Sequence, residues 1–82
     1  MELSKGQIVR SKAGRDEGYF MAVVGTDGER CLVCDGKERP LSRPKAKNPK
    51  HLAVTASVLT EEEMATDRKL RAALATFGAR ND

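Results

Sequence analysis

The chain has 82 residues, of which 39% are hydrophobic and only 4% aromatic, and its 15 lysines and arginines exceed its 12 acids to give a formal charge of +3. A chain of this length forms one small domain, and it contains nothing close to the roughly 18–20 consecutive apolar residues that span a bilayer. Residues 1–5 lack the apolar core of a secretion signal, so we expect a cytoplasmic protein without a membrane partner.

Short apolar stretches separated by glycine turns fill the first 57 residues. Asp27-Gly28 and Asp35-Gly36 are strong hairpin signals, because these dipeptides suit tight turns between antiparallel strands. The pattern predicts five strands, over residues 6–11, 19–26, 30–35, 38–41 and 51–57. Turns that need a positive φ or a close backbone approach are expected at Gly14, Gly18, Gly28 and Gly36. Five short strands favour a small antiparallel β-barrel over residues 1–57, because closure removes exposed edges.

A proline-punctuated segment carries most of the excess positive charge. Pro40, Pro44 and Pro49 cannot donate to a sheet ladder, which predicts an edge or an extended loop with its charges in solvent. Residues 37–50 contain one acid, Glu38, and six bases: Lys37, Arg39, Arg43, Lys45, Lys47 and Lys50. By contrast, residues 54–82 contain four bases and five acids. This asymmetry favours a polyanionic partner, although a lysine-rich loop can also serve solubility alone.

A C-terminal helix is predicted after the barrel, in a second segment over residues 58–82. Thr60 and Glu63 form a capping-box pattern, which predicts a helix over residues 61–76, ended by Gly78 and followed by a frayed tail at residues 79–82. Asp67 and Arg71 are spaced for an ion pair. One face of this helix carries an apolar stripe, whose members are Leu70, Ala73, Leu74 and Phe77. The stripe either packs on the barrel, which we favour, or binds a partner protein.

The spacing of the two cysteines does not indicate a metal site or a redox pair. Cys31 and Cys34 lie in a predicted strand, where residues three apart point to opposite faces. A zinc site needs about four ligands, and His51 is the only further candidate. We therefore expect both thiols to be reduced, with one in the core and one nearer the surface, and we expect neither a metal nor a cofactor.

Catalysis has little support in the sequence. His51 is the only histidine, no phosphate-binding or nucleophile motif is present, and the adjacent Asp16 and Glu17 are expected to point apart in a solvated loop. The chain is therefore predicted not to be an enzyme.

Nucleic-acid binding has more support, and RNA is favoured over DNA because no basic helix suits a major groove. Arg15, Arg39 and Arg43 suit phosphate contacts or stacking on bases. Tyr19 and Phe20 are adjacent on a strand, so one should face the core and the other solvent. Without a larger aromatic platform, recognition of the backbone of a folded RNA is expected.

One segment resembles a KOW motif, which consists of a strand, a glycine-bounded loop and a second strand. The resemblance rests on Gly6-Gln7-Ile8-Val9-Arg10-Ser11-Lys12-Ala13-Gly14-Arg15-Asp16-Glu17-Gly18 with Ala22-Val23-Val24, and continues in Cys31-Leu32-Val33-Cys34-Asp35-Gly36 and Asn48-Pro49-Lys50-His51-Leu52. The chain is most similar to short bacterial KOW-domain RNA-binding proteins, which are related to archaeal and eukaryotic large-subunit ribosomal proteins. The similarity covers about residues 3–57 and excludes the helix.

The resemblance implies an SH3-like barrel that binds RNA, usually ribosomal RNA. Carried over to this chain, its candidate contacts are the loop Lys12-Ala13-Gly14-Arg15 together with Arg39, Lys50 and His51. Glu17 and Met21 depart from the pattern, since many KOW loops have a basic residue and a further glycine there. Glu17 would repel phosphate, which moves the expected contacts toward residues 37–51. KOW barrels in elongation factors contact proteins, so a protein-interaction adaptor of the translation or transcription machinery is the alternative.

Overall fold

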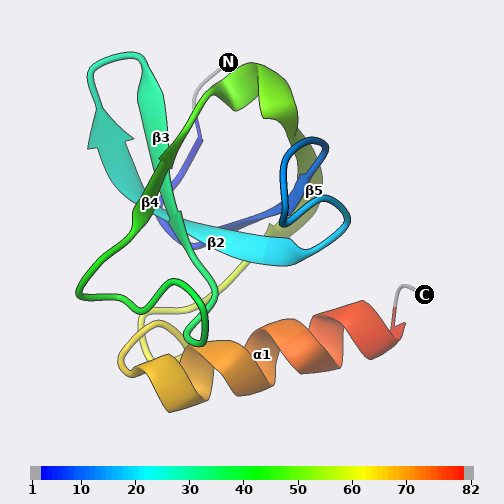
Figure 1. The fold of residues 1–82 in the computed structure, drawn as a ribbon. Coiled ribbons are helices and arrows are strands. Elements are labelled where there is room, and N and C mark those ends of the chain that lie inside the picture. Colours follow the sequence, from blue (N-terminus) through cyan, green and yellow to red (C-terminus); the bar gives the residue numbers. More distant parts are fainter. Residues whose placement is uncertain (1–2, 81–82) are drawn as a thin grey trace.

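The computed structural model describes residues 3–80, which form one antiparallel sheet followed by a C-terminal helix (Figure 1). The sheet has five strands in the spatial order β4-β3-β2-β1-β5. The elements in chain order are β1 (Gln7–Ser11), β2 (Phe20–Asp27), β3 (Arg30–Cys34), β4 (Lys45–Lys47), the short 3-10 helix η1 (Pro49–His51), β5 (Leu52–Val58) and α1 (Asp67–Arg80). The prediction of a mainly β fold with one C-terminal helix is therefore confirmed.

The described pairings leave β4 and β5 as the two edges of the sheet. β4 pairs with β3 and β5 pairs with β1, and η1 links the two edge strands across the end of the curled sheet (Figure 1). The described sheet thus has five strands, and no strand pairing between β4 and β5 closes it into a barrel.

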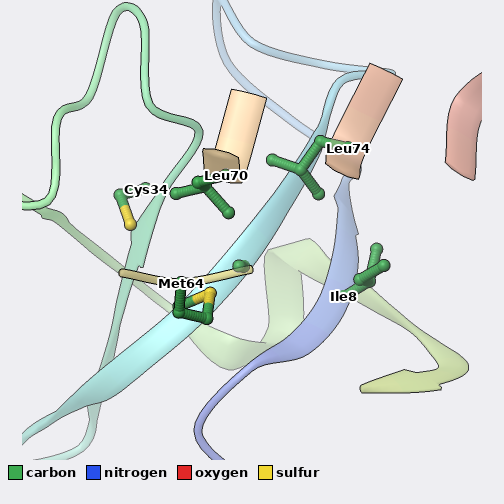
Figure 2. Packing of buried hydrophobic residues seen from close by; sticks show 6 residues of the cluster. Ile8, Cys34, Met64, Leu70 and Leu74 are labelled. Atoms are coloured by element: carbon green, nitrogen blue, oxygen red, sulfur yellow. The ribbon is translucent and has the colours of Figure 1, made fainter. Parts of the chain in front are cut away.

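Both faces of the sheet are buried, because side chains alternate between two hydrophobic clusters. The inner cluster, on the face turned away from α1, contains Val9, Met21, Val23, Cys31, Val33 and Leu52. The helix cluster lies between the sheet and the C-terminal segment, and contains Ile8, Ala22, Cys34, Met64, Leu70 and Leu74. Figure 2 shows Leu70 and Leu74 of α1 facing the strands that carry Ile8 and Cys34. The apolar stripe of the helix is therefore packed on the sheet, as we favoured.

The burial of both faces corrects the expectation for the cysteines. Cys31 and Cys34 point to opposite faces, as predicted, but both are buried because α1 covers the face on which Cys34 lies. Both thiols are free. Burial raises the pKa of Cys34 to about 12, and the nearby carboxylates of Asp67 and Asp35 add to this effect. Neither thiol is poised to react at neutral pH.

The predicted strand at residues 38–41 is wrong, because residues 35–44 form a loop. The Asp35 carboxylate accepts hydrogen bonds from the backbone N–H groups of Lys37 and Arg39, both at 2.9 Å. The carbonyl of Arg39 in turn accepts from the backbone of Asp35 and of Gly36. These bonds, with a proline at position 40, close the segment on itself before it can pair as a strand. The fourth strand is instead Lys45–Lys47, which lies at an edge as its flanking prolines predicted.

The helix begins later than predicted, although the capping box forms. Glu63 N–H donates to the Thr60 hydroxyl at 3.2 Å, and Thr60 N–H donates to the Glu63 carboxylate at 2.9 Å. These bonds cap a turn over residues 61–64, which places Met64 in the helix cluster. The chain then starts α1 at Asp67, where the Thr66 hydroxyl accepts from Lys69 N–H at 3.1 Å.

The C-terminal end of α1 also differs from the prediction. Gly78 does not end the helix, which continues to Arg80, and residues 81–82 of the predicted frayed tail lie outside the described residues. The predicted Asp67–Arg71 ion pair is replaced by contacts to the loop: the Asp67 carboxylate accepts from Leu41 N–H at 2.7 Å, and Arg71 donates to the Gly36 carbonyl at 3.3 Å. α1 is thereby fastened to residues 36–41. Within residues 3–80, no helix has the length and apolar character needed to cross a membrane.

Candidate nucleic-acid interface

The loop between β1 and β2 is held in place by the carboxylate of Asp16, a group that the sequence predicted to lie in solvent. Asp16 accepts hydrogen bonds from the Ser11 hydroxyl at 2.8 Å and from the Lys47 ammonium at 2.7 Å. Lys47 also donates to the Ala13 carbonyl at 2.9 Å, and Lys45 lies 3.4 Å from the second carboxylate oxygen. Lys47 is only 6% exposed. The expectations that Asp16 is solvated and that the charge of Lys47 faces solvent are therefore wrong, because β4 lies against this loop.

This arrangement sets the acidity of Asp16. Burial raises its pKa, but the hydrogen bonds from Lys47 and Ser11 and the attraction of Lys47 and Lys45 outweigh burial and lower the pKa from 3.8 to about 2. The folded protein therefore holds Asp16 ionised more strongly than the unfolded chain does.

Acid should weaken the fold through Asp16. Because its pKa is lower in the folded state, its contribution to stability is complete above about pH 4 and is lost as the pH falls toward 2, with a total of about 2 kcal/mol. Urea unfolding of the natural chain and of Asp16→Asn should show a difference in the free energy of unfolding that shrinks over this range. A difference that stayed constant down to pH 2 would contradict the role given to Asp16.

An exposed tyrosine lies between two hollows next to this loop. Tyr19 is 61% exposed, whereas its neighbour Phe20 packs edge-on against Phe77 with ring centroids 5.1 Å apart. This confirms that one of the two aromatic residues faces solvent. Each hollow has a volume of about 350 Å³, and Tyr19, Asp35 and Glu38 line both. The first hollow adds Arg15, Arg39 and Lys45, and the second adds Lys37 and Arg71.

We call this region the Tyr19 surface, and define it as Arg15, Tyr19, Lys37, Arg39, Lys45 and Arg71. Its five cationic side chains outnumber the three carboxylates of the two hollows, Asp16, Asp35 and Glu38. Asp16 pairs with Lys45 of this surface as well as with Lys47, and Asp35 caps its own loop. The surface is net cationic and surrounds an exposed aromatic ring, so it offers groups for phosphates and for a base.

The remaining candidate contacts lie elsewhere. Lys12 N–H donates to the His51 carbonyl at 2.8 Å, which places the start of the loop beside η1. Lys12, Lys50 and His51 are all exposed there. Arg43 is exposed in the turn before β4 and lines neither hollow of the Tyr19 surface. The structure thus gathers four of the nine predicted RNA contacts on the Tyr19 surface, namely Arg15, Lys37, Arg39 and Lys45.

The predicted turn glycines all have positive φ, with values of 87° at Gly14, 89° at Gly18, 64° at Gly28 and 79° at Gly36. Tyr19 and Arg71 are not among the contacts that the sequence predicts. The position of Tyr19, directly after Gly18 and before a core-facing aromatic residue, was the available signal for its exposure. Arg71 carried no such signal, because its place on the surface depends on the docking of α1.

Within the described part of the chain, no three His, Cys, Asp or Glu side chains form a group that could hold a metal ion. Comparison with known protein families and with curated protein sequences found no match to this chain.

Proposed function

We propose that the protein is an RNA-binding module that contacts folded RNA, with ribosomal RNA as the partner that its KOW-like sequence implies, and that its curled sheet acts as an SH3-like barrel. The observation that carries this proposal is the exposed ring of Tyr19, placed between hollows that Arg15 and Arg39 line on one side and Arg71 lines on the other. Arginine binds phosphate through two parallel hydrogen bonds, and a tyrosine ring stacks on an unpaired base.

The burial of Lys47 narrows the surface that RNA can use. Its ammonium is bound by Asp16 and by the Ala13 carbonyl, so it is not free to meet a phosphate. The basic run at residues 37–50 therefore does not act as one continuous strip. The Tyr19 surface instead takes charges from the loop after β1, from the loop after β3, from β4 and from α1.

Replacing Tyr19 with alanine should weaken RNA binding by about tenfold, because stacking of one base on an aromatic ring contributes about 1–3 kcal/mol. Tyr19→Phe should retain most of the affinity, since it keeps the ring. The measurement is fluorescence anisotropy with a labelled RNA stem-loop, compared with a fully paired duplex of the same stem. Equal affinity of Tyr19→Ala and the natural chain for the stem-loop would show that the ring does not contact a base.

The salt dependence of the RNA association constant tests the phosphate contacts separately. About four to six phosphate contacts predict a slope of roughly −3 to −5 for the logarithm of the association constant against the logarithm of salt concentration. Arg15→Ala and Arg39→Ala should each make the slope shallower by about one. Arg30→Ala is the matched control, because Arg30 is exposed but lies in the β2–β3 hairpin and lines neither hollow of the Tyr19 surface. A slope near zero would exclude electrostatic RNA binding.

The alternative function, a protein adaptor that binds its partner through the apolar stripe of α1, has less support than RNA binding. Leu70 is fully buried and Leu74 is 7% exposed, so the two leucines of the stripe are already covered by the sheet, whereas Ala73 and Phe77 are partly buried.

A further inference from the structure

The two edges of the sheet differ in how they are protected. β4 has three residues, two of which are lysines, and it lies between Pro44 and Pro49. Short length, lysine and proline are common means by which proteins prevent an edge strand from pairing with another chain. β5 has seven residues, Leu52–Val58, and contains no charged residue and no proline. The β4 edge is therefore blocked, whereas β5, whose register with β1 shifts between Gln7 and Val9, keeps a longer uncharged edge for a further strand.

β5 also presents the groups that such a strand would use. The carbonyls of Thr55 and Ser57 accept hydrogen bonds from the Gln7 side chain on β1, at 2.6 and 3.3 Å. Since successive residues of a strand direct their backbone groups to opposite sides, Ala56 directs its N–H and C=O away from β1. The side chains of Val54 and Val58 are 37% and 53% exposed. The open edge combines backbone groups with apolar side chains that a neighbour would cover.

The charges at the two ends of β5 indicate which neighbour fits. Lys50 and His51 precede the strand, and Glu61 and Glu62 follow it. All four are exposed, and Glu62 also lies 3.6 Å from the ammonium of Lys69 in α1. In an antiparallel pair related by a two-fold axis, the beginning of each strand lies beside the end of the other. Two copies of β5 paired in this way would bring the basic end of each copy to the acidic end of its neighbour, at two places.

We propose that β5 pairs antiparallel with β5 of a second copy of this chain, joining the two five-stranded sheets into one continuous sheet. The contact is small, so the dimer is weak and reversible. The Tyr19 surface contains no residue of β5 or of its charged ends, so dimerisation leaves it open on both copies.

Sedimentation equilibrium of the full chain from about 1 µM to 1 mM tests this proposal, a range that covers weak self-association. The expected result is a reversible rise in mass from 9.0 kDa toward twice that value. Ala56→Lys should weaken dimerisation at least tenfold, because it places a charge on the open edge. Ala46→Lys is the matched control, since it adds the same side chain at an exposed position of β4, and it should leave the dimer unchanged.

Charge reversal provides a second test that leaves the strand itself intact. Two double variants reverse the charge at one end of the strand: Lys50→Glu with His51→Glu, and Glu61→Lys with Glu62→Lys. Each double variant should weaken dimerisation by about fivefold or more, and a chain that carries all four substitutions should regain the affinity. Circular dichroism of every variant establishes that it is folded. A monomer mass at all concentrations, a dimer insensitive to Ala56→Lys, or a failure of the combined charge reversal to restore affinity would each overturn the proposal.

Discussion

Replacing Gly36 with alanine is expected to lower the free energy of unfolding by about 3 kcal/mol or more, through backbone strain and steric overlap. Gly36 has a φ of +79°, and a Cβ atom there would collide with the carbonyl oxygen of Asp67 and lie 3.1 Å from the backbone nitrogen of Arg71. Both atoms belong to the first turns of α1. The side chain would therefore push the helix away from the loop that it fastens, and Leu70 would lose part of its packing.

The matched control for this variant is Gly28→Ala. Gly28 also has a positive φ, +64°, but no atom lies within 4 Å of the position its Cβ would take. Its cost is the left-handed conformation alone, about 1–2 kcal/mol. Guanidinium unfolding followed by circular dichroism measures both variants. Equal losses would show that the approach of α1 to Gly36 does not contribute to stability.

Replacing Asp16 with asparagine is expected to lower the free energy of unfolding at pH 7 by about 2–3 kcal/mol, because an almost buried lysine loses its counter-charge. Asparagine keeps an oxygen for the Ser11 hydroxyl but removes the negative charge that Lys47 meets at 2.7 Å. The ammonium would retain the Ala13 carbonyl, a neutral partner. Urea unfolding measures the loss.

Two further variants separate the ion pair from general effects. Glu17→Gln removes a neighbouring acid that is exposed, and it should change stability by less than about 0.5 kcal/mol. Asp16→Asn combined with Lys47→Met should recover part of the loss, because no buried charge remains without a counter-charge. If Asp16→Asn cost no more than Glu17→Gln, the loop would not depend on this pair.

The sequence determined the strands and turns that depend on neighbouring residues. Short apolar stretches bounded by glycine turns predicted β1, β2 and β3, and alternation of apolar and polar side chains predicted β5, each to within about one residue; the Asp27-Gly28 turn formed where it was expected. The capping box at Thr60 formed as well. These features rely on contacts between residues a few positions apart, which a reading of the sequence can evaluate.

Contacts between distant segments decided the rest. The carboxylate of Asp67, at the start of α1, binds the backbone of Leu41, 26 residues away, and Met64 enters the core only through the turn that delays the helix. Lys47 is buried where it binds Asp16, 31 residues away, and the Ala13 carbonyl, and these contacts remove it from the basic surface. The Tyr19 surface likewise draws its charges from two loops, β4 and α1. The overall charge of +3 was plain in the sequence, but which of its cations face solvent together was settled by tertiary packing.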